Sequence, residues 1–165
     1  MSDKSMQPGP LDAFDLRILD ILQRDNRTPQ RRIGELVNLS APAVQRRIKR
    51  MEEEGVIAAN VAILAPEKLG RPLSVIIEVS VESERIDHLD AAKAAFRAAP
   101  EVQQCYYVTG DVDFVLIVLV ADMAEYEALT RRLFFGNHNV KKFRTLVTMD
   151  RVKSGAAIAM RVSSE

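Results

Sequence analysis

Apolar residues in the first third of the chain recur at the spacing of one buried helical face. This spacing predicts three consecutive helices. Asp12 and Ser40 are suited to cap the first and the third, because their side-chain oxygens can accept from free backbone N–H groups. Gly55 is expected to end the third helix, and weak alternation over 56–64 predicts a small β-ribbon. The apolar positions of the three helices are Phe14, Ile18, Ile21 and Leu22, then Ile33, Leu36 and Val37, then Val44, Ile48 and Met51.

From Leu73 onward the apolar period changes to that of a β-strand. Strands are predicted at 73–81, 102–109, 112–120 and 140–152, with one helix carrying Leu89, Ala92 and Phe96 and another beginning at Asp122. A tight turn at Gly110–Asp111 is expected to join the second and third strands as an antiparallel hairpin. The order β-α-β-β-α-β is that of the ferredoxin-like fold, which carries both helices on one sheet face and leaves the other open. A partner subunit is the expected cover for that open face.

The sequence therefore predicts an α+β protein with two domains. Residues 1–64 are expected to form a winged helix-turn-helix domain, with residues 1–10 loose. Residues 65–71, interrupted by Pro66 and Gly70, form the expected linker. Residues 72–165 are expected to form a ferredoxin-like domain that oligomerises through its open sheet face, loose after Met160.

Composition excludes several classes of protein. Of the 165 residues 47% are apolar and 28% charged, as in a globular chain. One cysteine and two histidines lie too far apart for a zinc-ligand spacing, so neither a metal nor a cofactor is expected. The longest apolar run, 114–121, is too short to cross a bilayer, and residues 1–10 lack the apolar segment of a signal peptide, which predicts a cytoplasmic protein without membrane contact. Cys105 is expected to be a buried structural thiol, and His88 and His138 solvated.

Net charge is zero, but its distribution is uneven. Seven basic residues and one acid lie between Arg27 and Arg50. Three cations of the third helix, Arg46, Lys49 and Arg50, are expected opposite its apolar face. A guanidinium can read guanine, an amide can read adenine, and point charges can hold phosphates. A lone basic helix is often only a solvated face, but the short helix and turn before it favour a helix-turn-helix. The residues expected at double-stranded DNA are Arg32, Ser40, Ala43, Gln45, Arg46, Arg47, Lys49 and Arg50.

Four stretches of this chain resemble the leucine-responsive regulator/AsnC family of transcriptional regulators. They are Leu11-Asp12 to Leu22; Arg32-Ile-Gly-Glu-Leu-Val-Asn-Leu-Ser40 with Ala43-Val-Gln-Arg-Arg-Ile-Lys-Arg-Met-Glu-Glu-Glu-Gly-Val-Ile57; and Tyr107-Val-Thr-Gly-Asp-Val-Asp113. The resemblance covers nearly all of the chain after Pro10. It implies a non-enzymatic regulator whose dimers pair through their sheets, assemble further into tetramers or octamers, and bind an amino acid or related metabolite between dimers.

Two positions in the turn depart from that family, which usually has Ala on the second helix and Gly four residues later. This chain has Gly34 and Asn38 there. Gly34 is expected to preserve close helix packing at some cost in helix propensity. Asn38 is expected to adopt the left-handed conformation that the turn requires.

The Gly110 turn is a candidate small-molecule site. Its backbone N–H groups could hold a carboxylate, and Asp111 and Asp113 could hold an ammonium, which together are the two ends of an amino acid. The turn alone is more often a simple Gly-Asp turn; the resemblance favours a ligand. Thr148 and Met149 are expected on the last strand, where they could cap or line the pocket or be ordinary sheet residues. The full set of effector residues expected from the resemblance is Tyr107, Thr109, Gly110, Asp111, Asp113, Thr148 and Met149.

Two other functions compete with an amino-acid-responsive regulator. A small enzyme is disfavoured because the sequence lacks a phosphate loop, a nucleophile paired with a base, and metal ligands. An architectural DNA-organising protein, in which the second domain only oligomerises, is the closer rival. On that interpretation Asp113→Ala would leave DNA binding unchanged with or without metabolites.

Overall fold

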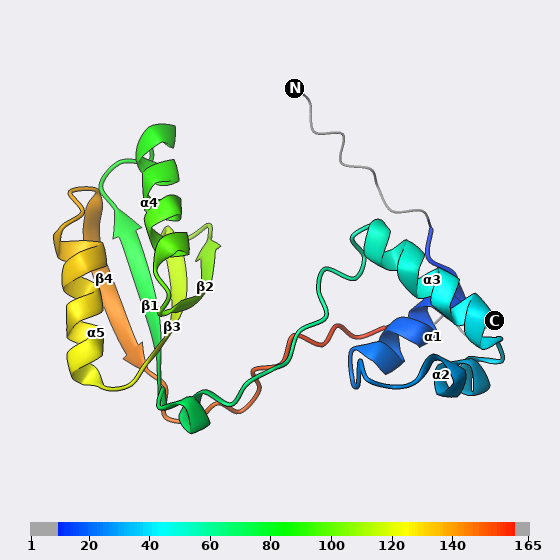
Figure 1. Ribbon diagram of the computed structural model, residues 1–165. Helices are drawn as coiled ribbons and strands as arrows, with labels where there is room; N and C mark the ends of the chain where they lie inside the picture. The colour runs from blue at the N-terminus through cyan, green and yellow to red at the C-terminus, as the bar shows by residue number, and fades with distance from the viewer. Residues whose placement is uncertain (1–9, 161–165) are drawn as a thin grey trace. The chain divides into compact units, whose positions relative to one another are not determined.

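The computed structural model describes residues 10–160 and begins with three helices, α1 (Ala13–Leu22), α2 (Gln30–Val37) and α3 (Ala41–Glu53) (Figure 1). Asp12 caps α1 by accepting from the backbone N–H of Asp15, whose side chain accepts from Asp12 in return. Ser40 caps α3 by accepting from the backbone N–H of Ala43 at 3.3 Å. Both predicted caps are confirmed; residues 1–9 and 161–165 lie outside the described part, so looseness there stays a prediction.

The turn between α2 and α3 depends on Gly34 and Asn38, the two residues that depart from the family pattern. Asn38 ends α2 at φ 59°, the left-handed conformation expected of it. A β-carbon on Gly34 would lie 2.4 Å from the carbonyl oxygen of Leu39, so only glycine permits this approach. The two expectations are confirmed, and together they let α3 begin four residues after α2 ends.

The core of the first unit differs from the prediction at Phe14 and Leu36, which are 36% and 51% exposed. Because Gly34 faces α3, Leu36, about 200° around the helix from it, points away. Gly55 ends α3 at φ 72° as expected. The predicted ribbon over 56–64 is wrong: no strand is seen there, since no second segment of the described chain pairs with it. The buried core is Ile18, Leu19, Ile33, Val37, Val44 and Met51.

The second unit has the predicted element order. A short 3-10 helix, η1 (Pro66–Leu69), precedes β1 (Leu73–Val81), and α4 (Ile86–Ala98) connects β1 to β2 (Val102–Tyr107). Then come β3 (Phe114–Val120), α5 (Met123–Thr130), a π-helical turn η2 (Arg131–Phe135) and β4 (Val140–Val147). The sheet is antiparallel with strand order β2-β3-β1-β4. This is the predicted ferredoxin-like arrangement.

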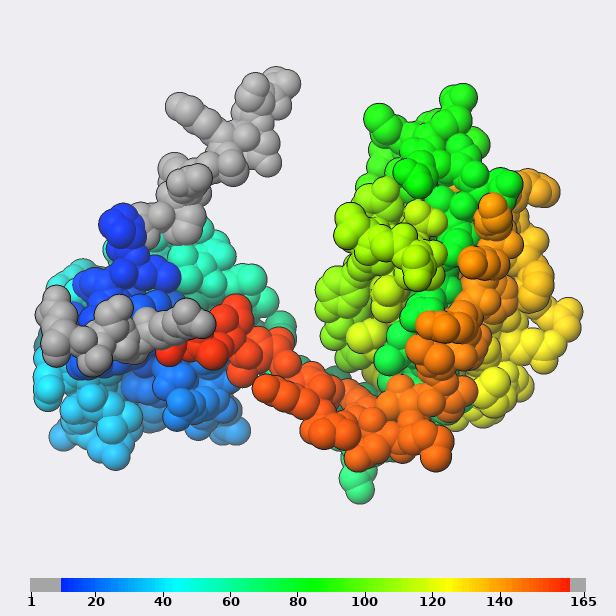
Figure 2. All heavy atoms as spheres, turned by 180° about the vertical axis from the view of Figure 1, so that it is seen from behind, coloured from blue at the N-terminus to red at the C-terminus, as the bar shows by residue number. Residues whose placement is uncertain are grey.

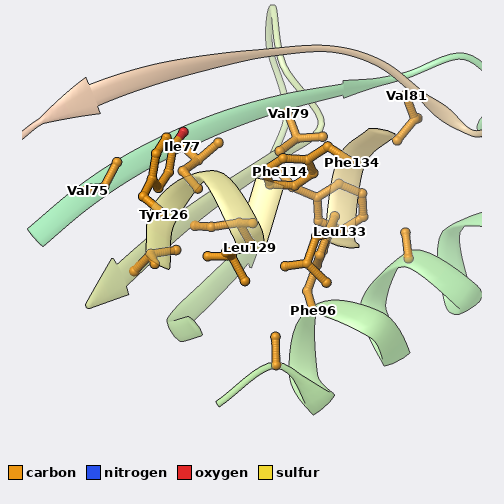
Figure 3. Close-up of a cluster of buried hydrophobic side chains, with 14 of the residues drawn as sticks. Val75, Ile77, Val79, Val81, Phe96, Phe114, Tyr126, Leu129, Leu133 and Phe134 are labelled. Carbon is orange, nitrogen blue, oxygen red and sulfur yellow. The ribbon is translucent and has the colours of Figure 1, made fainter. Parts of the chain in front are cut away.

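One face of the sheet carries the core and both helices (Figure 3). Alternate residues of β1 and β3, including Ile77 and Phe114, point toward α4, α5 and η2. Phe96 of α4 packs edge-on against Phe114 with ring centroids 5.3 Å apart. The other face, which carries Ile76, Val115 and Ile117, is only half-buried.

Two strand ends differ from the prediction. The connection between β2 and β3 has six residues, 108–113, rather than a two-residue turn. β4 ends at Val147, so Thr148 and Met149 follow the strand instead of lying in it. The reason is that β1 begins at Leu73: the N–H of Thr148 donates to Ser74, and only Leu73 of β1 lies beyond that pair.

The described chain forms two compact units and passes from one to the other twice; each passage is called a crossing. The first crossing falls between Ile63 and Leu64, and the second between Lys153 and Ser154. We expected residues 72–165 to stay together; residues 154–160 instead group with the helix-turn-helix, because Met160 and the backbone of Ile158 contact it. None of the described helices is long and apolar enough to cross a membrane.

Candidate functional site

Helix α3 turns its apolar residues inward and a polar face outward. Val44 and Met51 are fully buried. On the opposite side Gln45 and Arg46 are exposed, and neither side chain has a hydrogen bond or ion pair to any described residue. Lys49 is exposed as well and is 3.7 Å from Glu53 one turn further on. These three side chains are available to a ligand outside the domain.

Arg47 and Arg50 are used inside the domain. Asp15 of α1 is 1% exposed, and its two carboxylate oxygens accept from Arg47 at 2.8 Å and from Arg50 at 2.5 Å. The expectation that Arg50 faces solvent beside Arg46 and Lys49 is therefore wrong. A helical wheel places Arg50 away from the apolar stripe, but it does not show that α1 presents a carboxylate within reach of a long side chain.

The environment of Arg47 changes two pKa values. The hydrogen bonds that Arg47 donates to Asp15 and Asp12 raise the pKa of Arg47. Burial alone would raise the pKa of Asp12, but the N–H of Asp15 and the guanidinium of Arg47 outweigh it and hold that pKa below its ordinary value. Arg47 also lies over the ring of Phe14, 5.5 Å from its centroid, which gives this exposed aromatic residue a partner.

The remaining predicted DNA residues lie at the start of the motif. Arg32 is exposed and shares Glu35 with Arg31, at 3.1 and 3.5 Å. Ser40 is exposed, but its hydroxyl already accepts from Ala43, which is half-buried. These residues lie beside the turn and at the N-terminus of α3.

The turn over residues 108–113 divides its two aspartates. The carboxylate of Asp113 accepts from the backbone N–H of Val81 at 2.7 Å, and its own N–H donates to Val79, so it fastens the turn to β1. Asp111 is exposed and has no hydrogen bond or ion pair to the described residues. Gly110, at φ 128°, adopts the positive φ that was expected. Asp111 is thus the carboxylate available to a ligand.

A cavity of about 430 Å³ lies beside the turn, at the edge of the open sheet face. Asp111 lines it, and so do Lys142 and Arg144 of β4; Arg144 is held by Glu78 at 2.6 Å. Ser80 of β1 is 7% exposed, and its hydroxyl has no hydrogen-bond partner in the described part of the chain. The cavity therefore offers both signs of charge and an unsatisfied hydroxyl. Its residues on β1 and β4 are absent from the predicted set.

Tyr107 and Thr109 precede Gly110: Tyr107 ends β2, and Thr109 lies in the turn. The ring of Tyr107 packs against Phe114, with centroids 5.1 Å apart, and the ammonium of Lys93 lies 4.9 Å from it. A second cavity, of about 420 Å³, includes Lys93, Tyr107 and Cys105. Thr109 is exposed and outside both cavities.

Cys105 corrects one expectation: it is exposed on the edge strand β2 rather than buried. Partial burial still raises the pKa of its thiol, against the opposing effect of Arg97. The thiol is therefore not activated as a nucleophile. His88 and His138 are exposed as expected, and no three metal-ligating side chains gather among residues 10–160.

Thr148 and Met149 do not meet the turn within one chain. Thr148 bonds to Ser74, whereas the turn is fastened at Val79, five residues further along β1. At 3.3 Å per residue the two sites are about 17 Å apart. Met149 is 98% exposed, and the hydroxyl of Thr148 is buried without a partner in the described chain.

Known proteins match both units. The family model for the Lrp/AsnC ligand-binding domain matches residues 74–158, and a winged helix-turn-helix DNA-binding model matches residues 11–58. An uncharacterized HTH-type transcriptional regulator of Sinorhizobium fredii is 46% identical over 92% of this chain and 90% of its own length. The leucine-responsive regulatory protein of Haemophilus influenzae is 39% identical over 87% of this chain and 86% of its own length.

Solved structures agree with these sequence matches. A transcriptional regulator of Neisseria meningitidis in complex with L-methionine has a TM-score of 0.85 and 27% identity, covering 91% of this chain and 97% of its own. An AsnC-family regulator of Agrobacterium tumefaciens has the same TM-score and 32% identity, over 90% and 97%. The chain therefore belongs to the Lrp/AsnC family and is a DNA-binding transcriptional regulator, not an enzyme.

Proposed function

We propose that this regulator contacts double-stranded DNA through the outward side chains of α3 and responds to a free amino acid. The first part rests on one observation: Gln45 and Arg46 are exposed and have no hydrogen bond or ion pair with residues 10–160, and they lie on the helix that a helix-turn-helix inserts into the major groove. Arg46 offers a fork for guanine or a phosphate, and Lys49 a point charge for a phosphate. Arg32 and Ser40 would lie beside the backbone, whereas Arg47 and Arg50 act by holding α3 to α1.

Salt and one substitution test the DNA part. A dimer that neutralises about six to ten phosphates should lose about 10³–10⁵ in affinity between 50 and 200 mM salt. Arg46→Ala should weaken binding to a duplex selected from a random pool by the wild-type protein, by about 1–3 kcal/mol more than to unselected DNA if Arg46 reads a base. Arg131→Ala, at the start of η2 in the other unit, is the charge-matched control. Unchanged affinity in Arg46→Ala would remove α3 from the interface.

The second part of the proposal is an amino-acid effector at the cavity beside the turn. Relatives are named for responses to leucine and for glutamate uptake, and a structural relative was solved with L-methionine. A free amino acid has an ammonium and a carboxylate. In the cavity the carboxylate of Asp111 would bind the ammonium of the amino acid, and the ammonium of Lys142 would bind its carboxylate. The hydroxyl of Ser80 on β1 is a further hydrogen-bond partner.

A thermal-shift screen against L-leucine, L-methionine and L-glutamate, each alone, tests this site. A ligand at about 100 times its Kd should stabilise the folded state by about 2.7 kcal/mol. Asp111→Ala and Lys142→Ala should abolish the shift, while Lys141→Ala, its neighbour paired with Glu82, should retain it. If no amino acid binds the wild-type protein, the architectural interpretation replaces this one.

We also propose that the open face of the sheet is the homodimer interface. Ile76, Ile117 and Leu119 are half-buried there and Leu146 is 42% exposed, which is more apolar surface than a solvated sheet face needs. Thr148 and Met149 would then reach an effector only from another subunit, in a dimer, tetramer or octamer working in the cytoplasm. Light scattering of Ile117→Arg should show a smaller oligomer. Ile86→Arg, on the helix side, should leave the mass unchanged.

A further inference from the structure

The segment after β4 returns to the DNA-binding unit and is held there by a specific contact. Gln23, directly after α1, holds the backbone of Ile158: its Nε2 donates to the carbonyl oxygen at 2.8 Å, and its Oε1 accepts from the N–H at 2.9 Å. In Figure 2 the red spheres of this segment lie against the blue spheres of the first helix. The pair of bonds recognises the extended backbone, not a side chain.

A groove between α1 and α2 receives the next residues. Met160 packs against the core of the helix-turn-helix, at its edge. A cavity of about 490 Å³ remains around it. Leu36, half exposed on α2, lines this cavity, which explains why an apolar residue lies on the outer side of that helix. Three residues of α1 line it as well, Arg17, Asp20 and Ile21.

The docked segment is held weakly. Each of the two hydrogen bonds is neutral and exposed, so each favours docking by about tenfold or less. Ordering the backbone of residues 154–160, which form no helix or strand, opposes docking. The two bonds and the packing of Met160 favour docking against this cost, so a bias at either end of the segment can change the populations of the docked and released states.

We propose that residues 154–160 are a strap that docks in the α1–α2 groove and couples the ligand-binding domain to the DNA-binding domain. The strap begins seven residues after β4 ends at Val147, so the stretch that contains Thr148 and Met149 leads directly into it. A ligand or a neighbouring subunit that fixes this stretch changes how readily the strap docks. The coupling step rests on the proposed function; the docking step does not.

Hydrogen exchange of the full-length protein tests docking first. Gln23→Ala should increase the exchange rate of the Ile158 amide severalfold, because its N–H loses the acceptor Oε1 of Gln23. Gln30→Ala, an exposed amide on α2 that does not touch the strap, should leave the rate unchanged. Equal exchange in the wild type and Gln23→Ala would overturn docking. Protection that rises with protein concentration would assign it to another copy's strap and overturn docking within one chain.

The second experiment measures coupling in the same variants. For the selected duplex, the ratio of Kd values with and without saturating L-leucine, L-methionine or L-glutamate should move toward 1 in Gln23→Ala and in a chain ending at Lys153. Calorimetry should show that these variants still bind the amino acid. A ratio unchanged from wild type would overturn coupling. If no amino acid binds the wild type, the effector proposal fails and coupling with it, while docking stands on the exchange result.

Discussion

The basic helix α3 and the acidic turn over residues 108–113 each have some charged side chains that bind within their own unit and another that faces outward. The inward side chains of the two regions have different kinds of partner. In α3, Arg47 and Arg50 face the domain and Arg46 faces outward; in the turn, Asp113 faces β1 and Asp111 faces outward. The inward arginines share one buried carboxylate, whereas the inward aspartate accepts from a backbone N–H. Two neighbouring residues of the same charge can therefore have different roles. The contacts of the inward arginines and those of the inward aspartate should contribute differently to the free energy of unfolding.

The largest expected effect is at the shared carboxylate. Asp15→Ala should lower the free energy of unfolding by about 3 kcal/mol, because it removes the capping interaction and leaves Arg47 and Arg50 without their buried partner. Denaturant unfolding measures it. Asp20→Ala, which loses a surface pair with Arg24 and a long hydrogen bond from Gln23, should cost about 1 kcal/mol or less. A similar small loss in Asp15→Ala would mean that the arginines hydrate freely.

The next effect concerns close packing in the DNA-binding unit. Gly34→Ala should destabilise the protein by about 2 kcal/mol: the new methyl group meets the carbonyl of Leu39, and the gain in helix propensity offsets only part of the strain. Thermal unfolding checks this. Gly155→Ala meets nothing within 4 Å and should leave the midpoint nearly unchanged. A stabilised Gly34→Ala would show that the α2–α3 turn relaxes at little cost.

The two aspartates of the turn should separate stability from ligand response. Asp113→Ala leaves the N–H of Val81 unpaired and should cost about 1–2 kcal/mol of stability. Asp111→Ala should change stability by less than about 0.5 kcal/mol and still lose the amino acid. Unfolding curves of both variants, recorded with and without amino acid, measure this. Equal losses of stability would mean that both carboxylates serve the fold.

The smallest effect is a pH dependence at the first cap. Because the pKa of Asp12 is lowered in the folded state, its stabilising contribution is present above its ordinary pKa and is lost as pH falls through the folded value. The stability of Asp12→Asn should therefore fall short of the wild type near pH 7 and approach it below about pH 4. Asparagine still caps a helix, so the difference reports the charge. A constant difference across this range would assign the effect to hydrogen bonding alone.

Local features of the fold could be predicted from the sequence, whereas its long-range pairings could not. The caps at Asp12 and Ser40 and the left-handed Asn38 depend on residues within four positions of each other. The partner of Arg50 is 35 residues away, and no helical period indicates it. The false ribbon after Gly55 has the same cause, because alternation indicates a strand only where a second strand is present.

The same difference between local and long-range features applies to the candidate site. The turn was found from its own residues, but the cavity beside it takes Ser80 from β1 and Lys142 from β4. Only a weak pattern in the sequence indicates Ser80 and Lys142. Both belong to the alternate polar residues on the open side of two strands, which the predicted order places side by side.

The two crossings between the units affect how regulators of this kind can recombine. A chimera joined once, after Ile63, would unite the helix-turn-helix of one protein with the strap of another. Its Gln23 would still hold a backbone, but its groove would receive a foreign residue in place of Met160. Grafting a new DNA specificity onto this ligand-binding domain therefore calls for two junctions, the second after Lys153, or for exchange of the outward side chains of α3 alone.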